Sequence, residues 1–255
     1  MRNELMPATA DFQKRAPEYE HNSRWVTSDS INNVPYTYLC LRKSLGRLLD
    51  AGGGTGYLSW FLSSKLPSDS ITILDASSNM LLQAKERLPY ARTVCDSLES
   101  FCLSSSEKYD TVLARQILHY VDDVDLALSC LRKMLKKEGV IYIGQFVVQD
   151  SASDDWHMAL IQRISKSRKR SFVQAELIRQ CEKSGFKVLN SCCTDYEENL
   201  MDFFKRRMNE ETEYSALLDA SKKSLNRQVI SSLSIRTTNN NLFFTVQFCH
   251  LLLGY

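Results

Sequence analysis

Short apolar runs alternate along this chain with longer segments in which apolar side chains recur every three or four residues. Helical spacing is clearest between residues 124 and 135, where the apolar positions follow an i, i+3, i+4, i+7 pattern. Strands that alternate with helices indicate a parallel sheet with helices on both faces. The apolar runs predict seven strands, at residues 47–51, 71–74, 93–95, 109–114, 140–148, 186–193 and 242–253.

The last apolar run, residues 242–253, departs from this alternation. The helical pattern before it ends near residue 229, and a polar stretch separates the two. This connection suits an antiparallel strand at the edge of the sheet. We therefore expect an α/β fold of the Rossmann-like, doubly wound type, with a mostly parallel seven-stranded sheet and one antiparallel edge strand.

Two helical regions lie outside this alternation. Residues 1–46 contain no clear strand, and Phe12, Ala16 and Tyr19 recur at helical spacing, which predicts an N-terminal helical cap. The Rossmann-like domain then covers residues 47–255, and its helical segment at about 197–229 is expected to cover the substrate together with the cap. Between the domain's last strands, residues 149–170 are mostly polar and predict a connection.

A capping pattern marks the next helix. Ser171 and Gln174 have the spacing of a capping box, so we expect the helix that leads to Gly185 to begin there.

A glycine series follows the first predicted strand. Asp50, Gly52, Gly54 and Gly56 alternate with other residues, and a helical pattern starts at Tyr57. A strand, a glycine turn and a helix form a cradle in which backbone N–H groups face a ligand. Dinucleotide sites use Gly-x-Gly-x-x-Gly, so the third glycine here comes one position early. The leading carboxylate disfavours a phosphate and favours a ligand that carries sulfonium and ammonium groups.

Two more acids end the next two strands. Asp75 ends the second strand, where a carboxylate can accept hydrogen bonds from two ribose hydroxyls. Asp96 ends the third strand and precedes Ser97, where it can accept the amino group of adenine. Each of these acids taken alone is an ordinary solvated strand end, and the glycines alone are a tight turn. Their joint placement with Asp50 favours a site for a sulfonium nucleoside.

On these residues the chain resembles the class I S-adenosylmethionine-dependent methyltransferases, and among them the small-molecule branch that includes the ubiquinone/menaquinone biosynthesis enzymes. The matching stretches are Leu48–Gly56, Ile71–Leu81, Val94–Leu98, Tyr109–Asp123 and Leu131–Phe146, with Ser171–Phe186 as weaker support. The resemblance implies that S-adenosyl-L-methionine is the cofactor. It also implies a set of cofactor-binding residues: Tyr19, Asp50, Ala51, Gly52, Gly54, Gly56, Asp75, Ala76, Met80, Asp96, Ser97, Ala114 and Arg115.

The reaction that the resemblance implies is the in-line displacement of a methyl group from sulfur. Such catalysis depends on aligning donor and acceptor and on excluding water. A phenol or enol acceptor also needs a base, and His119, just after the fourth strand, is the candidate because a neutral imidazole takes up a proton near pH 7. The alternative is that His119 packs locally. The acceptor atom stays open, with oxygen first and nitrogen or carbon next.

Aromatic residues outside the common sheet suggest a small-molecule acceptor that is aromatic or partly apolar. Residues of this kind can equally be the core of the cap helices. His157, beside Trp156, is more simply a surface-loop residue than part of the substrate site. The candidate acceptor-binding residues are Phe12, Trp25, Tyr120 and Phe203.

The charge pattern bears on the partners. The net charge of +2 argues neither for nor against acidic partners, and the basic run at residues 166–170 is isolated. That run can grip an anionic substrate or an RNA phosphate, but a solvated loop face is the simpler interpretation. We expect no nucleic-acid partner; a methyltransferase acting on RNA or protein and a non-catalytic cofactor-binding protein remain the alternatives.

The cysteine content and the length of the apolar stretches bear on metal binding and on the cellular compartment. None of the eight cysteines forms a Cys-x-x-Cys pair or has zinc-like spacing with a histidine, so we expect reduced thiols, mostly buried, and no metal site. No stretch approaches the ~18 apolar residues that span a membrane. Residues 1–20 have no apolar core and are not a secretory signal. We therefore expect a cytoplasmic protein.

Overall fold

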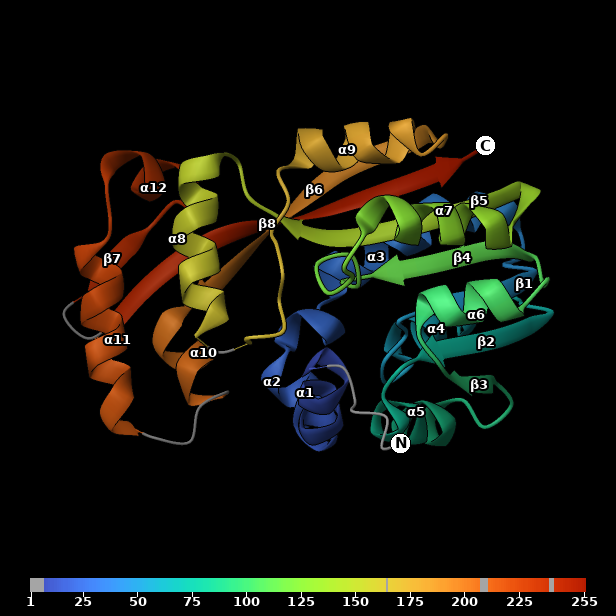
Figure 1. The fold of residues 1–255 in the computed structure, drawn as a ribbon, viewed down its shortest axis with the longest axis horizontal. Helices are drawn as coiled ribbons and strands as arrows, with labels where there is room; N and C mark the ends of the chain where they lie inside the picture. Colours follow the sequence, from blue (N-terminus) through green and yellow to red (C-terminus); the bar gives the residue numbers. More distant parts are fainter. Residues whose placement is uncertain (1–6, 164, 207–210, 239–240) are drawn as a thin grey trace.

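The computed structural model describes residues 7–163, 165–206, 211–238 and 241–255, and shows one sheet with helices on both faces (Figure 1). The strand order is β3-β2-β1-β4-β5-β8-β6, and β7 pairs with β8 outside this order. The five strands from β3 to β5 are parallel. The strands are β1 (Arg47–Ala51), β2 (Ser70–Asp75), β3 (Arg92–Cys95), β4 (Tyr109–Arg115), β5 (Leu135–Val147), β6 (Lys187–Asn199), β7 (Arg236–Thr238) and β8 (Asn241–Gly254).

The α/β, mostly parallel fold is confirmed, and the position of the antiparallel strand is corrected. The last strand, β8, is antiparallel to both β5 and β6 and lies between them, one place in from the edge. The reason is that β6 pairs with β8 along almost its whole length, from Lys187 opposite Gly254 to Asn199 opposite Phe243. The short strand β7 was not predicted, because its three residues are exposed and polar.

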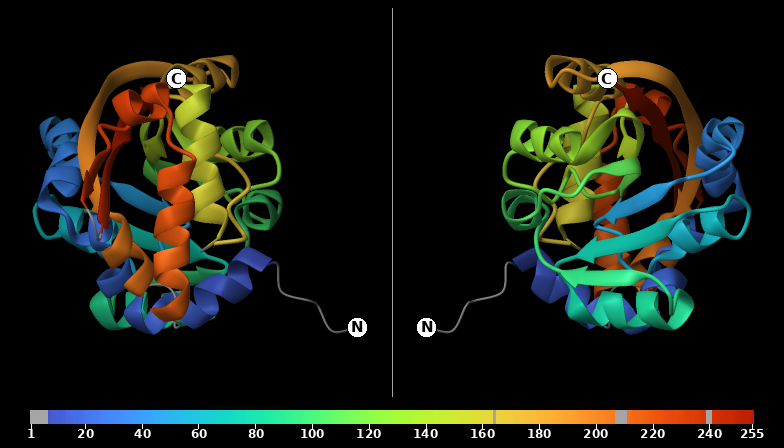
Figure 2. Two further views of the ribbon diagram at one scale, coloured as in Figure 1. Left: turned by 90° about the vertical axis from the view of Figure 1, so that its left-hand side faces the viewer. Right: turned by 90° about the vertical axis from the view of Figure 1, so that its right-hand side faces the viewer.

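Helices cover both faces of the sheet, and a further group of helices lies at the extended ends of its long strands (Figures 1 and 2). Side chains of α6, α7 and α9 pack on one face, and side chains of α3, α4 and α5 pack on the other. Helices α8 and α10–α12 enclose the extended ends of β5 and β8 in a third apolar cluster. The helices are α1 (Pro7–Arg15), α2 (Tyr19–Asn22), α3 (Asp29–Leu39), α4 (Tyr57–Ser63), α5 (Ser78–Arg87), α6 (Leu98–Ser104), α7 (Val124–Met134), α8 (Ser151–Gln162), α9 (Gln174–Lys183), α10 (Leu200–Lys205), α11 (Glu211–Lys223) and α12 (Arg227–Ser232).

The polar stretch at residues 149–170 is not only a connection. It contains the helix α8, which Asp150 caps by accepting a hydrogen bond from the backbone N–H of Ser153 at 2.8 Å. Few of its residues are apolar, but Trp156, Leu160 and Ile161 lie on one side of the helix and are buried. This narrow apolar stripe was too weak against the polar background to predict a helix.

The capping box expected at Ser171 is absent. Helix α9 begins at Gln174 after Val173, which makes no side-chain capping bond. The hydroxyl of Ser171 is buried without a hydrogen-bond partner among the described residues. Val148 instead forms a bridge with Val173, so this segment runs extended into the helix.

The two predicted covering segments are mostly helical where the structure describes them. Helices α1 and α2 lie beside α5, near the carboxyl ends of β1 and β2, whereas α3 covers the sheet (Figure 1). The segment 197–229 contains the end of β6 followed by α10, α11 and part of α12. Residues 1–6 of the expected cap and residues 207–210 of this segment lie outside the described residues.

The expectation of mostly buried, reduced cysteines is met in part. All eight thiols are free; Cys102, Cys130, Cys181 and Cys249 are buried, whereas Cys95 and Cys192 are exposed. The described residues contain no group of three or more His, Cys, Asp or Glu side chains placed to bind a metal ion. Across the same residues, none of the helices is long and apolar enough to span a membrane.

Candidate active site

The glycine turn between β1 and α4 has the backbone geometry that its sequence predicts. Gly52, Gly54 and Gly56 all have positive φ angles, of 65°, 54° and 71°. At Gly52 a Cβ atom would lie 2.1 Å from Cγ2 of Ile117, so no larger residue fits there. At Gly54 the space is open, and the nearest atom to such a Cβ would be Sδ of Met80 at 4.0 Å. The turn therefore leaves room for a ligand at Gly54.

The acid that ends β2 faces this turn. The backbone N–H of Gly54 donates to Oδ2 of Asp75 at 2.9 Å, and the N–H of Ser77 donates to Oδ1 at 2.8 Å. Burial raises the pKa of Asp75 to about 6, although both hydrogen bonds favour the ionised form. The carboxylate is thus fixed in orientation at the floor of an open space.

The acid that ends β3 is held in a similar way. The backbone N–H of Ser97 donates to Oδ1 of Asp96 at 2.8 Å, and Oγ of Ser100 donates to Oδ2 at 3.0 Å. Ser97 also caps α6 by accepting from the N–H of Ser100. Adjacent parallel strands bring Asp75 and Asp96 to the same end of the sheet, as the sequence predicts.

These acids line a cleft of about 350 Å³, which we call the main cleft. Ile117 and Val121 add apolar walls that the sequence analysis did not single out. Both residues lie just after β4 and close to Arg115 in the sequence. This position could have indicated that they line the site. The predicted residues that line the main cleft are Phe12, Tyr19, Gly52, Gly54, Asp75, Ala76, Met80, Asp96, Ser97, Arg115 and Tyr120.

Three predicted cofactor residues shape the main cleft without lining it. Ala51 and Ala114 are buried and face each other as partners in β1 and β4. Gly56 precedes α4, and a Cβ there would lie 3.0 Å from Ile73. Small side chains at these positions let the strands and the first helix pack closely behind the turn.

Asp50 lies behind the glycine turn, next to a small pocket of about 30 Å³ that Arg115 also lines. The hydroxyl of Ser59 donates to Oδ2 of Asp50 at 2.7 Å, and burial raises the pKa of this carboxyl. The guanidinium of Arg115 donates to Oδ1 of Asn32 at 2.8 Å and lies 5.1 Å from the ring centre of Trp25. The carboxyl group of Asp50 and the guanidinium of Arg115 are therefore held at the same end of the site.

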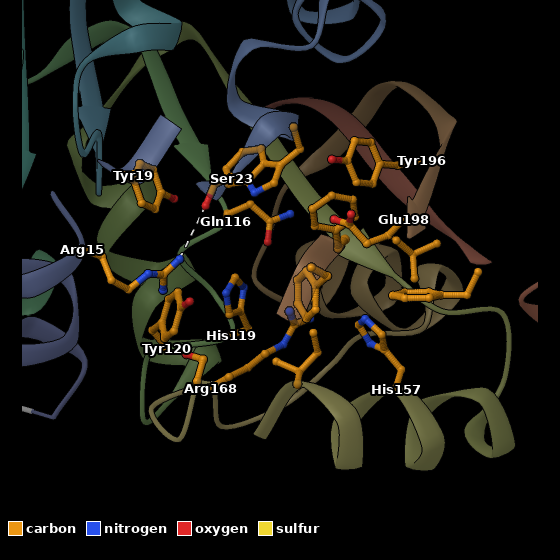
Figure 3. Close-up of a pocket in the computed structure, with 17 residues that line it drawn as sticks. Arg15, Tyr19, Ser23, Gln116, His119, Tyr120, His157, Arg168, Tyr196 and Glu198 are labelled. Atoms are coloured by element: carbon orange, nitrogen blue, oxygen red, sulfur yellow. Dashed lines mark hydrogen bonds between the residues drawn. The ribbon is translucent and has the colours of Figure 1, made fainter. Parts of the chain in front are cut away.

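A second cavity, the inner cavity, has a volume of about 80 Å³, and Figure 3 shows the residues that line it. Tyr19, Gln116 and Tyr120 line both spaces. Of the predicted acceptor residues, Trp25, Tyr120 and Phe203 line the inner cavity together with His119. Phe12 does not: it lies in the main cleft, with its ring centre 5.9 Å from that of Tyr19 and 5.0 Å from that of Tyr120.

His119 is buried, with 3% of its surface exposed. Its Nδ1 lies 2.8 Å from Nε2 of Gln145, the amide of a residue in the middle of β5. Burial lowers the pKa of His119 well below 6.5, so the ring is neutral at pH 7. The sequence analysis missed Gln145, although a glutamine within an apolar strand is a signal of a buried polar contact.

Two interpretations as surface residues are corrected. His157 is buried in α8 and lines the inner cavity; burial lowers its pKa to about 3. Arg168, in the middle of the basic run, is 7% exposed and also lines the inner cavity, whereas Lys166 and Lys169 are exposed. The loop turns only its central residues inward, which the uniform charge of the run does not reveal.

Comparison with known proteins finds similarity to methyltransferases. Residues 49–141 match the family described as a methyltransferase domain. A malonyl-[acyl-carrier protein] O-methyltransferase of Bacillus cytotoxicus is 26% identical over 172 residues, which cover 62% of this chain and 59% of that protein. The chain therefore spans less than two thirds of the length of this relative.

Two solved structures share the fold. A methyltransferase-like protein from Bacillus halodurans has a TM-score of 0.74 at 17% identity, over 86% of this chain and 97% of that one. The complex of DhpI with S-adenosylhomocysteine has a TM-score of 0.54 at 17% identity, over 97% and 98% of the two chains. At these identities the likeness establishes the fold.

Proposed function

We propose that this protein, whose residues 49–141 match a methyltransferase-domain family, transfers a methyl group from S-adenosyl-L-methionine to an oxygen atom of a small molecule. The observation that carries the proposal is the orientation of Asp75 in the main cleft, 2.9 Å from the backbone nitrogen of Gly54. A carboxylate so placed at the end of β2 accepts two ribose hydroxyls, and the open space at Gly54 admits the nucleoside.

The residues present fit this cofactor. Asp75 and Ala76 would hold the ribose, Met80 would pack on the adenine, and Asp96 with Ser97 would meet its polar edge. Asp50 and Arg115 offer one negative and one positive charge at the other end, which matches the ammonium and carboxylate of a methionine moiety. The cofactor supplies, when bound, a methyl group on a positively charged sulfur.

The inner cavity is the proposed acceptor site. Tyr19, Gln116 and Tyr120 line both the inner cavity and the main cleft. An acceptor in the inner cavity would therefore approach the methyl group of the cofactor at the boundary that these residues form. The rings of Trp25, Phe146 and Phe203 line it, which supports an acceptor that is partly apolar. The protein's contribution is then alignment of the two reactants and exclusion of water.

We also propose that the segments around the common sheet set the acceptor specificity. Tyr19 and Trp25 come from the N-terminal segment, and Phe203 comes from α10. The transfer to oxygen, in preference to nitrogen or carbon, is supported by the O-methyltransferase named among the relatives. On the acceptor side, Gln116 and His119 are among the polar groups that line the cavity beside these rings.

Calorimetry with S-adenosylhomocysteine tests the cofactor site. We expect the wild-type protein to bind it and Asp75→Ala to bind it at least ~10-fold more weakly, since two charge-assisted hydrogen bonds are lost. Undiminished binding by this variant contradicts the assignment. A metabolite extract incubated with the protein and cofactor, and analysed by mass spectrometry, should then reveal an acceptor that gains the mass of one CH₂ group.

A further inference from the structure

Gln116 has a strained backbone conformation. Its φ angle is 59°, in the left-handed region that residues other than glycine rarely adopt. Two further non-glycine residues in the described part of the chain have a positive φ, Lys43 and Ser234, and both are exposed. Gln116 is 8% exposed and lines both the main cleft and the inner cavity. Strain that is stored within a site suggests a functional role for the residue that carries it.

The turn at this position does not require a glutamine. Gln116 directly follows β4, and its backbone N–H donates to the carbonyl of Gly144 in β5 at 2.8 Å. The chain then turns, and the N–H of Tyr120 donates to the carbonyl of Ile117 at 2.9 Å. A glycine would adopt the same φ without the steric cost of a Cβ atom. The backbone alone therefore gives no reason for a long polar side chain here.

One end of the Gln116 amide has no partner. Its Oε1 accepts a hydrogen bond from Nε2 of Gln145 at 3.4 Å, whereas its Nε2 is buried without a hydrogen-bond partner among the described residues. Oε1 of Gln145 is unpartnered in the same way, but that residue lines neither space. If both amides were turned over, one end of Gln116 would still be free. A buried amide group without a partner is unfavourable, and a ligand at the boundary of the two spaces would satisfy it.

The location of this amide relates it to the reacting atoms of the proposed function. Arg115, the preceding residue, is proposed to meet the methionine end of the cofactor, and the rings of Trp25 and Phe203 line the acceptor side. Figure 3 shows Gln116 among the residues of the inner cavity. An acceptor held there would bring its reacting atom to the boundary with the main cleft, beside Gln116.

We propose that Gln116 is a specificity-determining residue: it donates a hydrogen bond from Nε2 to the attacking oxygen of the acceptor, and so selects oxygen over a neutral amine nitrogen. An oxygen atom can accept this bond with one lone pair and attack the methyl carbon with another. A neutral amine has a single lone pair and cannot do both. The carbon–sulfur bond then breaks, its electron pair stays on sulfur, and the proton of a hydroxyl acceptor is released to solvent. The same hydrogen bond favours the ionised form of a phenol or enol, which is the stronger nucleophile.

This inference rests on the proposed function, and paired acceptors separate the two. The protein is incubated at pH 7 with methyl-tritiated cofactor and with phenol or aniline, or with 2-naphthol or 2-naphthylamine; octanol and octanoate extend the oxygen acceptors to aliphatic chains. We expect label on at least one oxygen acceptor and at least ~10-fold less on either amine. Label on an amine at a rate equal to that on the best oxygen acceptor overturns selection by Gln116 and leaves methyl transfer standing. Absence of label from all acceptors overturns the inference, and calorimetry with S-adenosylhomocysteine then tests the cofactor site by itself.

Substitution of Gln116 tests the hydrogen bond. Gln116→Met keeps the length of the side chain but has no amide, and Gln116→Glu keeps its shape but has a carboxylate that can only accept. We expect both variants to lower kcat/KM for the labelled oxygen acceptor at least ~10-fold, with the Kd for S-adenosylhomocysteine within about threefold of the wild type. The matched control is Gln180→Met in α9, which lines neither space and should change kcat/KM by less than about twofold. Wild-type kcat/KM in Gln116→Glu overturns the role of Nε2 as donor, and a loss confined to the Kd shows a cofactor contact and overturns the proposal.

Two small side chains separate the strain from the hydrogen bond. Gln116→Ala keeps a Cβ atom in the left-handed conformation, whereas Gln116→Gly removes it, and both variants lack the amide. We expect the glycine variant to unfold about 2–4 °C above the alanine variant, and both to lose activity to the same extent as Gln116→Met. A glycine variant that unfolds below the alanine variant contradicts the strain on which the inference rests, and one that keeps wild-type kcat/KM overturns the proposal.

Discussion

The carboxylate of Glu20 in α2 forms a two-point ion pair with the guanidinium of Arg87 in α5, at 2.5 and 3.0 Å. The hydroxyl of Thr55, in the glycine turn, donates to the same carboxylate at 2.6 Å. Arg87 also donates to the carbonyl of Thr55 at 2.9 Å. The N-terminal segment that carries Tyr19 is thus fastened directly to the turn that would hold the cofactor.

Breaking this ion pair should loosen the N-terminal segment. We expect Arg87→Met to lower the free energy of unfolding by about 1–2 kcal/mol, because the pair is three-quarters buried and its hydrogen bonds are charge-assisted. The affinity for S-adenosylhomocysteine should fall several-fold, since Tyr19 lines the main cleft. A double-mutant cycle with Glu20→Gln, read by denaturant unfolding and calorimetry, should give a coupling energy of about 1 kcal/mol. A coupling energy near zero contradicts this role.

Two glycines of the turn should respond differently to a methyl group. Gly52→Ala places a Cβ within 2.1 Å of Ile117, so we expect a loss of several kcal/mol of stability or no folded protein. Gly54→Ala has open space and only the strain of its positive φ, so the protein should fold with a loss of about 1 kcal/mol. Its methyl group would project into the main cleft and weaken cofactor binding. Thermal unfolding and calorimetry on both variants measure this contrast; a well-folded Gly52→Ala with normal affinity contradicts it.

The main cleft was predictable because its geometry follows from local sequence. Parallel strands bring their carboxyl ends together, so Asp75 and Asp96 needed only two correctly placed strands to become neighbours. The glycine turn likewise depends on residues that are adjacent in the chain. The confirmed α/β fold has the same origin, in a strong alternation of strand and helix patterns.

The inner cavity was less predictable because its walls come from distant segments. Arg168 lies in a run of like charges, and only the packing of α8 and the 165–170 loop decides which member faces inward. No residue near His250 in the sequence indicates a role for it. In the structure it is buried, and its Nδ1 is hydrogen-bonded to the hydroxyl of Tyr142 at 2.8 Å between strands β5 and β8. The position of β8 inside the sheet is also set by long-range pairing, which no local pattern encodes.

The affinity for the cofactor should depend on pH through Asp75. The folded-state pKa of about 6 lies above the ordinary value of 3.8, so the free protein binds a proton here more tightly than the unfolded chain does. The contribution of Asp75 to stability is therefore present at low pH and lost as the pH rises through 6. Ribose hydroxyls donate to the ionised carboxylate, so ligand affinity changes in the opposite direction.

We expect the Kd for S-adenosylhomocysteine to be constant above about pH 7 and to rise by up to ~10-fold per unit below pH 6, where the carboxyl is protonated. Calorimetry between pH 5 and 8 measures this, with proton release near pH 6 visible as a dependence on buffer. Asp75→Asn cannot ionise and should bind weakly with no slope over this range. If the Kd of the wild-type protein is as independent of pH as that of the asparagine variant, the prediction that Asp75 controls cofactor affinity is contradicted.

Phe12 and Phe203 should affect different ligands, although both are aromatic candidates for acceptor binding. Phe12 contacts the ring of Tyr19 in the main cleft, whereas Phe203 is buried in α10 and lines the inner cavity. Replacement by leucine keeps much of the apolar volume and should cost about 1–1.5 kcal/mol of stability, which leaves both variants folded. We expect Phe203→Leu to raise the KM for the acceptor several-fold with the Kd for S-adenosylhomocysteine unchanged. Phe12→Leu should show the reverse. The test is whether each variant changes only one of these two constants. If both variants raise the KM for the acceptor and also the Kd for S-adenosylhomocysteine, the main cleft and the inner cavity act as one site, and the prediction is contradicted.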